Sequence, residues 1–167
     1  MKAKLIVEGR EFPIEINDPN LEKLLRPPKK TGYERVDEDC EYYYEHCEGG
    51  ACRVKAYNSK SDELSYECAN YYSDSTVAEN NARADKLMRQ LRRFAVEHRE
   101  NELDWKPNIC KYRIQYNWNS KRLEVDLNDV WQICGVFYFD SKKTANLAIE
   151  TFHDELIWYF TEYKDSL

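Results

Sequence analysis

Four cysteines lie close together in the chain, at Cys40, Cys47, Cys52 and Cys68. Four thiolates can surround a zinc ion as a closed tetrahedron, which is the usual arrangement of a structural zinc site. The spacing contains no CxxC pair, and His46 could replace one thiolate. The sequence therefore predicts a structural zinc in this segment, with scattered free thiols or a redox pair as the alternatives. The remaining two, Cys110 and Cys134, are expected to be buried thiols.

Acidic residues are concentrated around the first of these cysteines. Residues 34–48 contain one basic side chain, Arg35, and these acidic ones: Glu34, Asp37, Glu38, Asp39, Glu41, Glu45 and Glu48. The run is either a solvated surface or a contact surface for a basic partner. Because the whole chain carries a net charge of −6, we take these carboxylates as the candidate partner-binding site.

Basic residues are concentrated further along, on one expected helix, at Arg89, Arg92, Arg93 and Arg99. Such a face could bind nucleic-acid phosphates, with Tyr71 or Tyr72 stacking on bases. Against this, Glu79, Asp85 and Glu97 lie on the same helix, the isoelectric point is about 5.2, and no named nucleic-acid motif is present. The basic face could equally pair with the acidic segment, so direct nucleic-acid binding is the alternative hypothesis.

Residues suited to catalysis are sparse. The histidines, His46, His98 and His153, are isolated from one another, and neither GxSxG, GxGxxG nor a phosphate loop occurs. Because no nucleophile and base can be paired from the sequence, the protein is predicted not to be an enzyme.

The spacing of apolar residues predicts the elements that hold these groups. Steps of three and four residues predict one long amphipathic helix over residues 73–100, capped by Ser73, Asp74 or Thr76. Alternating apolar and polar residues predict hairpins at residues 4–16, 41–57 and 111–127 and a further short strand at residues 64–72. A nearly continuous apolar run at residues 130–139 predicts the most buried strand. A final helix is predicted from residue 140 onward, with an interruption near residues 153–154.

The expected fold class is α+β, with a largely antiparallel sheet packed against the long central helix and a C-terminal helix. Residues 1–28 are expected to form a hairpin-helix unit, and residues 29–167 the main domain. That domain contains the cysteine-rich hairpin segment (40–68), the long helix (73–100), and a hairpin with the C-terminal helix (103–167). No internal repeat is evident. No apolar run reaches membrane-spanning length, and the N-terminus lacks the apolar core of a signal peptide, so we expect no membrane partner.

Four segments of the sequence carry a resemblance to known proteins: TGYERV (31–36), ANYYSDSTVAENNARADKLMRQLRRFAVEHRE (69–100), VFYFDS (136–141) and LIWYFTEYKDSL (156–167). They resemble segments of a group of small phage and mobile-element proteins of Gram-positive bacteria. Some members of that group are anti-CRISPR proteins that inhibit the RNA-guided nuclease of type II systems. The resemblance implies cytoplasmic action in a bacterial host, and it supplies no catalytic residues.

An acidic protein of this size could dock on the positively charged channel in which such a nuclease holds its guide–DNA heteroduplex. The resemblance therefore implies a stoichiometric inhibitor that prevents target DNA from loading onto the guide-loaded nuclease. The acidic run would be part of the contact surface. Alternatively, aromatic residues near the C-terminus supply the affinity and the acidic run only keeps the protein soluble; these are Trp158, Tyr159 and Tyr163.

Overall fold

The computed structural model describes residues 2–21, 30–101, 103, 109–128, 132–133 and 135–163. It separates into two compact units, residues 1–31 and residues 32–167. The domain boundary predicted from the sequence, between residues 28 and 29, lies outside the described residues.

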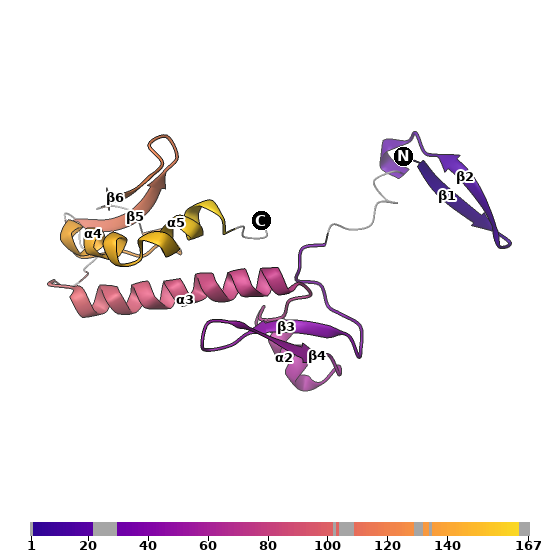
Figure 1. The fold of residues 1–167 in the computed structure, drawn as a ribbon, viewed down its shortest axis with the longest axis horizontal. Helices are drawn as coiled ribbons and strands as arrows, with labels where there is room; N and C mark the ends of the chain where they lie inside the picture. The colour runs from indigo at the N-terminus through magenta and orange to yellow at the C-terminus, as the bar shows by residue number, and fades with distance from the viewer. Residues whose placement is uncertain are drawn as a thin grey trace. The chain divides into compact units, whose positions relative to one another are not determined.

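The N-terminal unit contains the predicted hairpin, formed by β1 (Lys2–Val7) and β2 (Arg10–Glu15) (Figure 1). Glu8 and Gly9 join the strands with positive φ angles of 51° and 79°. Two such residues give the turn whose twist matches that of paired strands. One face of the hairpin carries Leu5, Val7 and Phe12, which are about half exposed.

The long helix of the second unit is α3 (Ser75–His98), as the sequence predicted. Asp74 is its N-cap, and the Asp74 carboxylate accepts hydrogen bonds from the backbone N–H groups of Thr76 and Val77 at 2.8 and 3.1 Å. The helix has two buried faces instead of the single predicted stripe. Its N-terminal half buries Ala78 and Ala82 completely, and the face that includes the expected apolar residues buries Leu87, Leu91 and Phe94.

Before α3 comes the hairpin of β3 (Glu41–Glu45) and β4 (Ala51–Lys55), followed by α2 (Lys60–Glu67). The predicted strand at residues 64–72 is therefore wrong over most of its length. Ser59 and Asp62 form a capping box, a helix-start signal that outweighs the alternation of apolar residues after it. The nearly buried Asp62 carboxylate also accepts hydrogen bonds from the Tyr57 N–H and the Tyr42 hydroxyl, each at 2.9 Å.

After α3 comes the hairpin of β5 (Lys111–Asn117) and β6 (Arg122–Asn128), followed by α4 (Lys142–Thr151) and α5 (His153–Thr161). The C-terminal helix is interrupted at Phe152, next to the predicted site. The predicted buried strand at residues 130–139 is wrong in its described part. Only Phe139 forms a β-bridge there, and Ile133 is 42% exposed.

The two hairpins and the helices that follow them repeat one arrangement, which the sequence did not reveal. Residues 41–98 form the first module and residues 111–151 the second. In each, an aromatic residue after the hairpin pairs antiparallel with the hairpin's first strand: Tyr72 with Tyr43, and Phe139 with Tyr112. The helix N-cap follows two residues later, at Asp74 or Ser141, and a fully buried alanine follows four residues after the cap, at Ala78 or Ala145.

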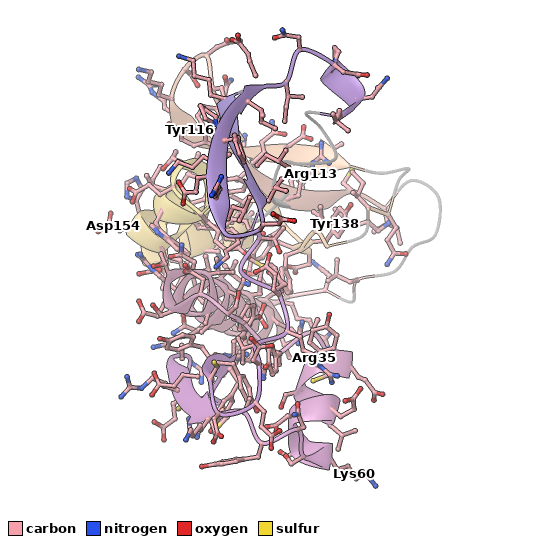
Figure 2. The ribbon with its side chains drawn as sticks, turned by 90° about the vertical axis from the view of Figure 1, so that its right-hand side faces the viewer. Arg35, Lys60, Arg113, Tyr116, Tyr138 and Asp154 are labelled. Atoms are coloured by element: carbon pink, nitrogen blue, oxygen red, sulfur yellow. The ribbon has the colours of Figure 1, made fainter. Side chains whose placement is uncertain are left out.

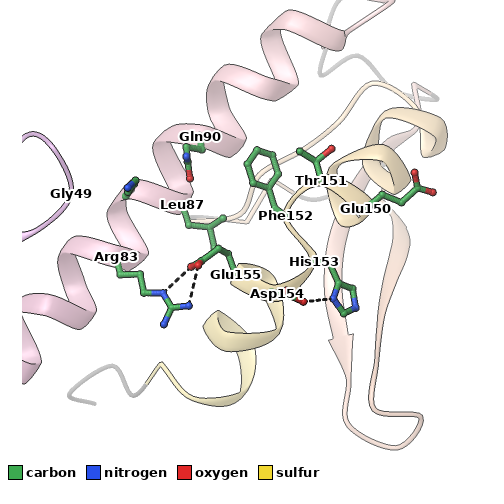
Figure 3. Close-up of a pocket in the computed structure, with 11 residues that line it drawn as sticks. Gly49, Arg83, Leu87, Gln90, Glu150, Thr151, Phe152, His153, Asp154 and Glu155 are labelled. Atoms are coloured by element: carbon green, nitrogen blue, oxygen red, sulfur yellow. Dashed lines mark hydrogen bonds and ion pairs between the residues drawn. The ribbon is translucent and has the colours of Figure 1, made fainter.

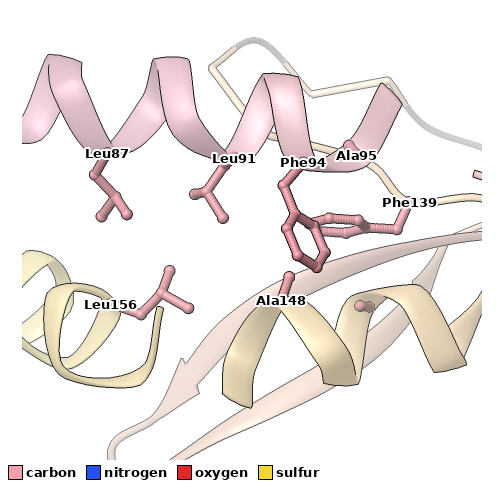
Figure 4. Close-up of a cluster of buried hydrophobic side chains, with 8 residues drawn as sticks. Leu87, Leu91, Phe94, Ala95, Phe139, Ala148 and Leu156 are labelled. Carbon is pink, nitrogen blue, oxygen red and sulfur yellow. The ribbon is translucent and has the colours of Figure 1, made fainter. Parts of the chain in front are cut away.

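Helix α3 lies between the two hairpins in both views (Figures 1 and 2), with Lys60 of the first module and Tyr138 beside the second on opposite sides of it. The main apolar core forms where α3 meets α4, α5 and Phe139 (Figure 4). A smaller core holds Tyr42, Ala56 and Tyr71 in the first module. The α+β class and the central helix are thus confirmed. The single sheet is not, because each described hairpin is a separate two-stranded sheet.

Candidate functional site

The C-terminal half of α3 presents an exposed basic face. Arg89, Arg92, Arg93 and Arg99 are all exposed, and Lys86 joins them one turn before Arg89. On the helix, Lys86, Arg89 and Arg93 lie opposite the buried stripe of Leu87, Leu91 and Phe94 and are directed away from the main core. Arg92 lies nearer that core, with its guanidinium 5.7 Å from the centre of the Phe137 ring, and Arg99 is the C-cap that follows the last helical residue.

The acidic residues on α3 neutralise this face only in part. Glu97 lies 3.9 Å from Arg93, a distance at which an exposed pair is weak. The Asp85 carboxylate interacts with the Glu45 carboxylate of β3 and raises the pKa of Glu45. The tyrosines predicted to stack on bases are not available, because Tyr71 and Tyr72 are each only 3% exposed. Any nucleic-acid contact here would rest on the basic side chains.

Four of the seven residues in the predicted acidic run make hydrogen bonds or ion pairs within the molecule. The Glu34 carboxylate accepts hydrogen bonds from Gly32 N–H and the Ser73 hydroxyl, at 3.0 and 2.8 Å. Asp39 and Glu41 pair across the hairpin with Lys55 and Arg53, at 2.9 and 3.3 Å. Glu45 is half-buried under the Tyr72 hydroxyl. Exposed carboxylates remain at Asp37, Glu38 and Glu48.

The structure does not support the predicted zinc site. Cys40 precedes β3 and Cys47 follows it, so a five-residue strand separates them by roughly 16 Å. Thiolates that share a zinc ion each lie about 2.3 Å from it. Among the described residues, no group of three or more His, Cys, Asp or Glu side chains is arranged to hold a metal. Cys110 is exposed instead of buried, and Cys134 lies outside the described residues.

A polar cleft of about 540 Å³ lies beside the basic face and shares Arg89 with it. Asn81 of α3 joins two tyrosines in this cleft: its amide donates to the Tyr33 hydroxyl at 2.6 Å and accepts from the Tyr163 hydroxyl at 2.5 Å. The hairpin turn approaches α3 closely at Gly49. A Cβ there would lie 2.6 Å from the Lys86 side chain, so Gly49 has a steric reason to be glycine.

Two cleft residues have perturbed pKa values. Burial raises the pKa of Glu45, and the neighbouring Asp85 carboxylate raises it further. Burial and the hydrogen bond to Glu45 raise the pKa of the Tyr72 phenol, which donates to Glu45 Oε1 at 2.5 Å. The sequence analysis named Glu45 as a partner-binding carboxylate and Tyr72 as a stacking residue, but it did not predict that the two pair in one cleft. The sequence signal for the cleft was the pair Asn81 and Asp85, which lie on the same side of α3 as the buried Ala78 and Ala82.

A second depression, of about 590 Å³, lies between α3 and the junction of α4 with α5 (Figure 3). Two pairs of its charged or titratable groups interact. Arg83 donates two hydrogen bonds to the Glu155 carboxylate, at 2.8 and 3.0 Å, and its guanidinium lies 3.8 Å from the centre of the Trp158 ring. Within α5, His153 Nδ1 lies 2.9 Å from Asp154 Oδ1. Because the contacts of Arg83 join α3 to α5, this depression is a weaker candidate than the polar cleft.

The C-terminal aromatics are poorly placed for the binding role considered for them. Trp158 is 8% exposed beneath Arg83, and Tyr159 and Tyr163 are half-buried against each other, with ring centroids 5.4 Å apart. Trp118, at the tip of the β5–β6 hairpin, is the most exposed of the described aromatic residues at 66%.

Comparison of the chain with family models, with curated proteins and with solved structures found no match. None of the helices in the described part of the chain is both long enough and apolar enough to cross a membrane. The basic face of α3, with the polar cleft beside it, is therefore a candidate from geometry alone.

Proposed function

We propose that this protein acts by binding a charged macromolecule stoichiometrically and not by catalysing a reaction. The observation that supports this most directly is the basic face of α3, where four cationic side chains are exposed on the helix and a fifth is exposed at its C-cap: Lys86, Arg89, Arg92 and Arg93, and then Arg99. Nucleic-acid phosphates are the partner that such a face fits, because each Lys or Arg can displace condensed counterions.

The proposal can be tested by charge reversal with a matched control. R89E/R92E/R93E removes the centre of the basic face, and K60E/K121E/K142E changes the net charge equally at exposed lysines on other elements. Fluorescence anisotropy with labelled DNA and RNA, at about 100 mM salt, measures binding. We expect the first variant to lose about tenfold or more in affinity and to show a shallower salt dependence. Equal loss in both variants would mean that net charge, and not this face, controls binding.

Inhibition of a type II CRISPR effector nuclease is the second candidate. It is favoured by the resemblance of residues 31–36, 69–100, 136–141 and 156–167 to the phage group that includes such inhibitors. It is also favoured by the exposed carboxylates Asp37, Glu38 and Glu48, which could meet a basic channel. In this proposal the bound protein prevents target DNA from loading.

A titration of DNA cleavage by a guide-loaded type II nuclease, with DNA binding followed in parallel, separates the two candidates. An inhibitor abolishes cleavage and DNA binding near one protein per nuclease. D37K/E38K/E48K should then relieve inhibition, whereas R89E/R92E/R93E should not. Unchanged cleavage with several nuclease orthologues would reject this candidate and leave nucleic-acid binding as the proposal.

A further inference from the structure

A small apolar cavity of about 190 Å³ lies beside the main core, lined by residues of α3, β5, α5 and the segment 135–139. Helix α3 contributes Met88 and Leu91, and α5 contributes Leu156, which points toward Leu91 (Figure 4). None of the described residues that line this cavity is charged. Apolar cavities of about this size stay free of water and can take up a molecule the size of benzene.

Aromatic side chains form much of the cavity wall. Phe137 and Phe139 come from the segment before α4, and Tyr159 and Phe160 come from α5. The ring centroids of Tyr159 and Phe160 are 5.5 Å apart, with the ring planes at 84° to each other. An aromatic ring that enters such a wall can pack edge to face against these rings, which adds to the gain from apolar burial. The wall therefore favours a ligand with a single aromatic ring.

The cavity opens to solvent at residues 135–137. Gly135 lines the cavity and is exposed, and a Cβ at Gly135 would meet no atom within 4 Å. Val136 and Phe137 also line the cavity and are half-buried. A small molecule can therefore enter at this point without unfolding of the main core.

Arg92 supplies a positive charge at this opening. It follows Met88 by one helical turn, so the two side chains are neighbours on α3. Its guanidinium lies 5.7 Å from the centre of the Phe137 ring. In the described part of the chain, no carboxylate forms an ion pair with Arg92. An anionic group at the opening can therefore pair with Arg92 without displacing a carboxylate of the protein.

We propose that this cavity binds a single-ring aromatic carboxylate, with the ring among Phe137, Phe139 and Phe160. The carboxylate of the ligand pairs with Arg92 at the opening. Burial of the ring and its dispersion contacts with the wall supply most of the affinity. The ion pair adds less, because water and salt screen it, but it makes the carboxylate preferred to a neutral analogue. The inference does not depend on which macromolecule the basic face binds.

The test uses the full-length protein with isotope-labelled methyl groups, titrated at neutral pH and followed by NMR. Phenylacetate is the probe, and phenylacetamide is its uncharged counterpart. The ring current of a bound phenyl group should shift the methyl resonances of four lining residues: Met88, Leu91, Ile114 and Leu156. The shifts should saturate with a Kd of about 1 mM or lower. Phenylacetamide should bind about two- to fivefold more weakly, because it lacks the ion pair at the exposed opening.

Arg92→Gln should weaken phenylacetate binding by about two- to fivefold and leave phenylacetamide binding unchanged. Lys60→Gln, at an exposed lysine of α2, is the matched control and should alter neither. Val136→Phe places a ring in the cavity and should abolish binding of both probes, with an unchanged circular dichroism spectrum as the check on folding. If that variant does not fold, the comparison of Arg92→Gln with wild type still decides. Methyl shifts that do not saturate, undiminished binding to folded Val136→Phe, or equal affinities for the two probes would overturn the proposal.

Discussion

The two modules share a backbone arrangement and differ in what they enclose. In the first, the bridging residue is Tyr72, whose hydroxyl donates to Glu45 beside a polar cleft. In the second, the bridging residue is Phe139, which is 1% exposed in the main apolar core. The same local geometry thus supports a polar, thiol-bearing site in one module and most of the stabilising burial in the other. The difference lies in the side chains, because the backbone pairs in the same way in both.

Helix α3 makes this division possible. Its N-terminal half has two fully buried alanines, Ala78 and Ala82, and the helix packs against β3 and β4 of the first module. Its C-terminal half supplies Leu87, Leu91 and Phe94 to the core shared with α4 and α5. The opposite side of that C-terminal half remains exposed and basic. One helix therefore serves both modules and presents the candidate interface.

The largest effect is expected from Phe139→Ala. Removing this ring leaves a cavity in the main core, which should reduce the free energy of unfolding by about 3–5 kcal/mol. Tyr72→Phe, the corresponding site in the first module, removes one hydroxyl and should cost about 1 kcal/mol. Urea denaturation measures both. If Tyr72→Phe cost as much as Phe139→Ala, the two modules would not divide stability and polar function in this way.

An intermediate effect is expected from Asp62→Ala, which removes the acceptor of the Tyr57 and Ser59 N–H groups and the Tyr42 hydroxyl. The free energy of unfolding should fall by about 2–3 kcal/mol at neutral pH, because partly buried hydrogen-bond donors become unpaired. The backbone hydrogen bonds from Ser59 and Tyr57 lower the pKa of Asp62. A group whose pKa is lower in the folded state stabilises the fold above its unfolded pKa, near 3.9, and less as the pH falls below it.

The difference in the free energy of unfolding between wild type and Asp62→Ala should accordingly be constant between about pH 5 and 8. It should become smaller below about pH 4. Urea denaturation across this range provides the measurement. A difference independent of pH down to pH 3 would mean that the ionised carboxylate does not stabilise the first module.

The smallest effect is expected from Glu45→Gln in the polar cleft. Burial raises the pKa of Glu45 above its ordinary value near 4.5, so the protonated form favours the fold. That contribution is present at low pH and is lost as the pH rises through the folded-state pKa. Glu45→Gln should therefore gain stability relative to wild type between about pH 4.5 and 7, by less than about 1 kcal/mol because the group is partly solvated. Parallel unfolding curves for Asp126→Asn, in the hairpin of the second module, provide the control.

The elements with strong local signals were predictable from the sequence. The long helix has apolar residues in steps of three and four and an N-cap at Asp74, and the three hairpins have alternating strands joined by short turns. Helix α2 was missed because residues 64–72 were interpreted as a strand and the capping box of Ser59 and Asp62 was not considered. The apolar run at residues 130–139 was expected to be a strand, and its described part is not one, because apolar content alone does not decide backbone conformation.

Contacts between segments distant in sequence determined the rest. The repeat of the two modules depends on the Tyr43–Tyr72 and Tyr112–Phe139 pairings, which leave little trace in residue identities. Cys47 and Cys68 border the polar cleft, whereas spacing along the chain grouped them with Cys40 and Cys52 as zinc ligands. The sequence alone determined which charges and thiols exist and which helix carries the arginines. Tertiary structure decided which carboxylates are paired, which tyrosines are buried and which thiols border the polar cleft, because those depend on how segments distant in sequence pack together.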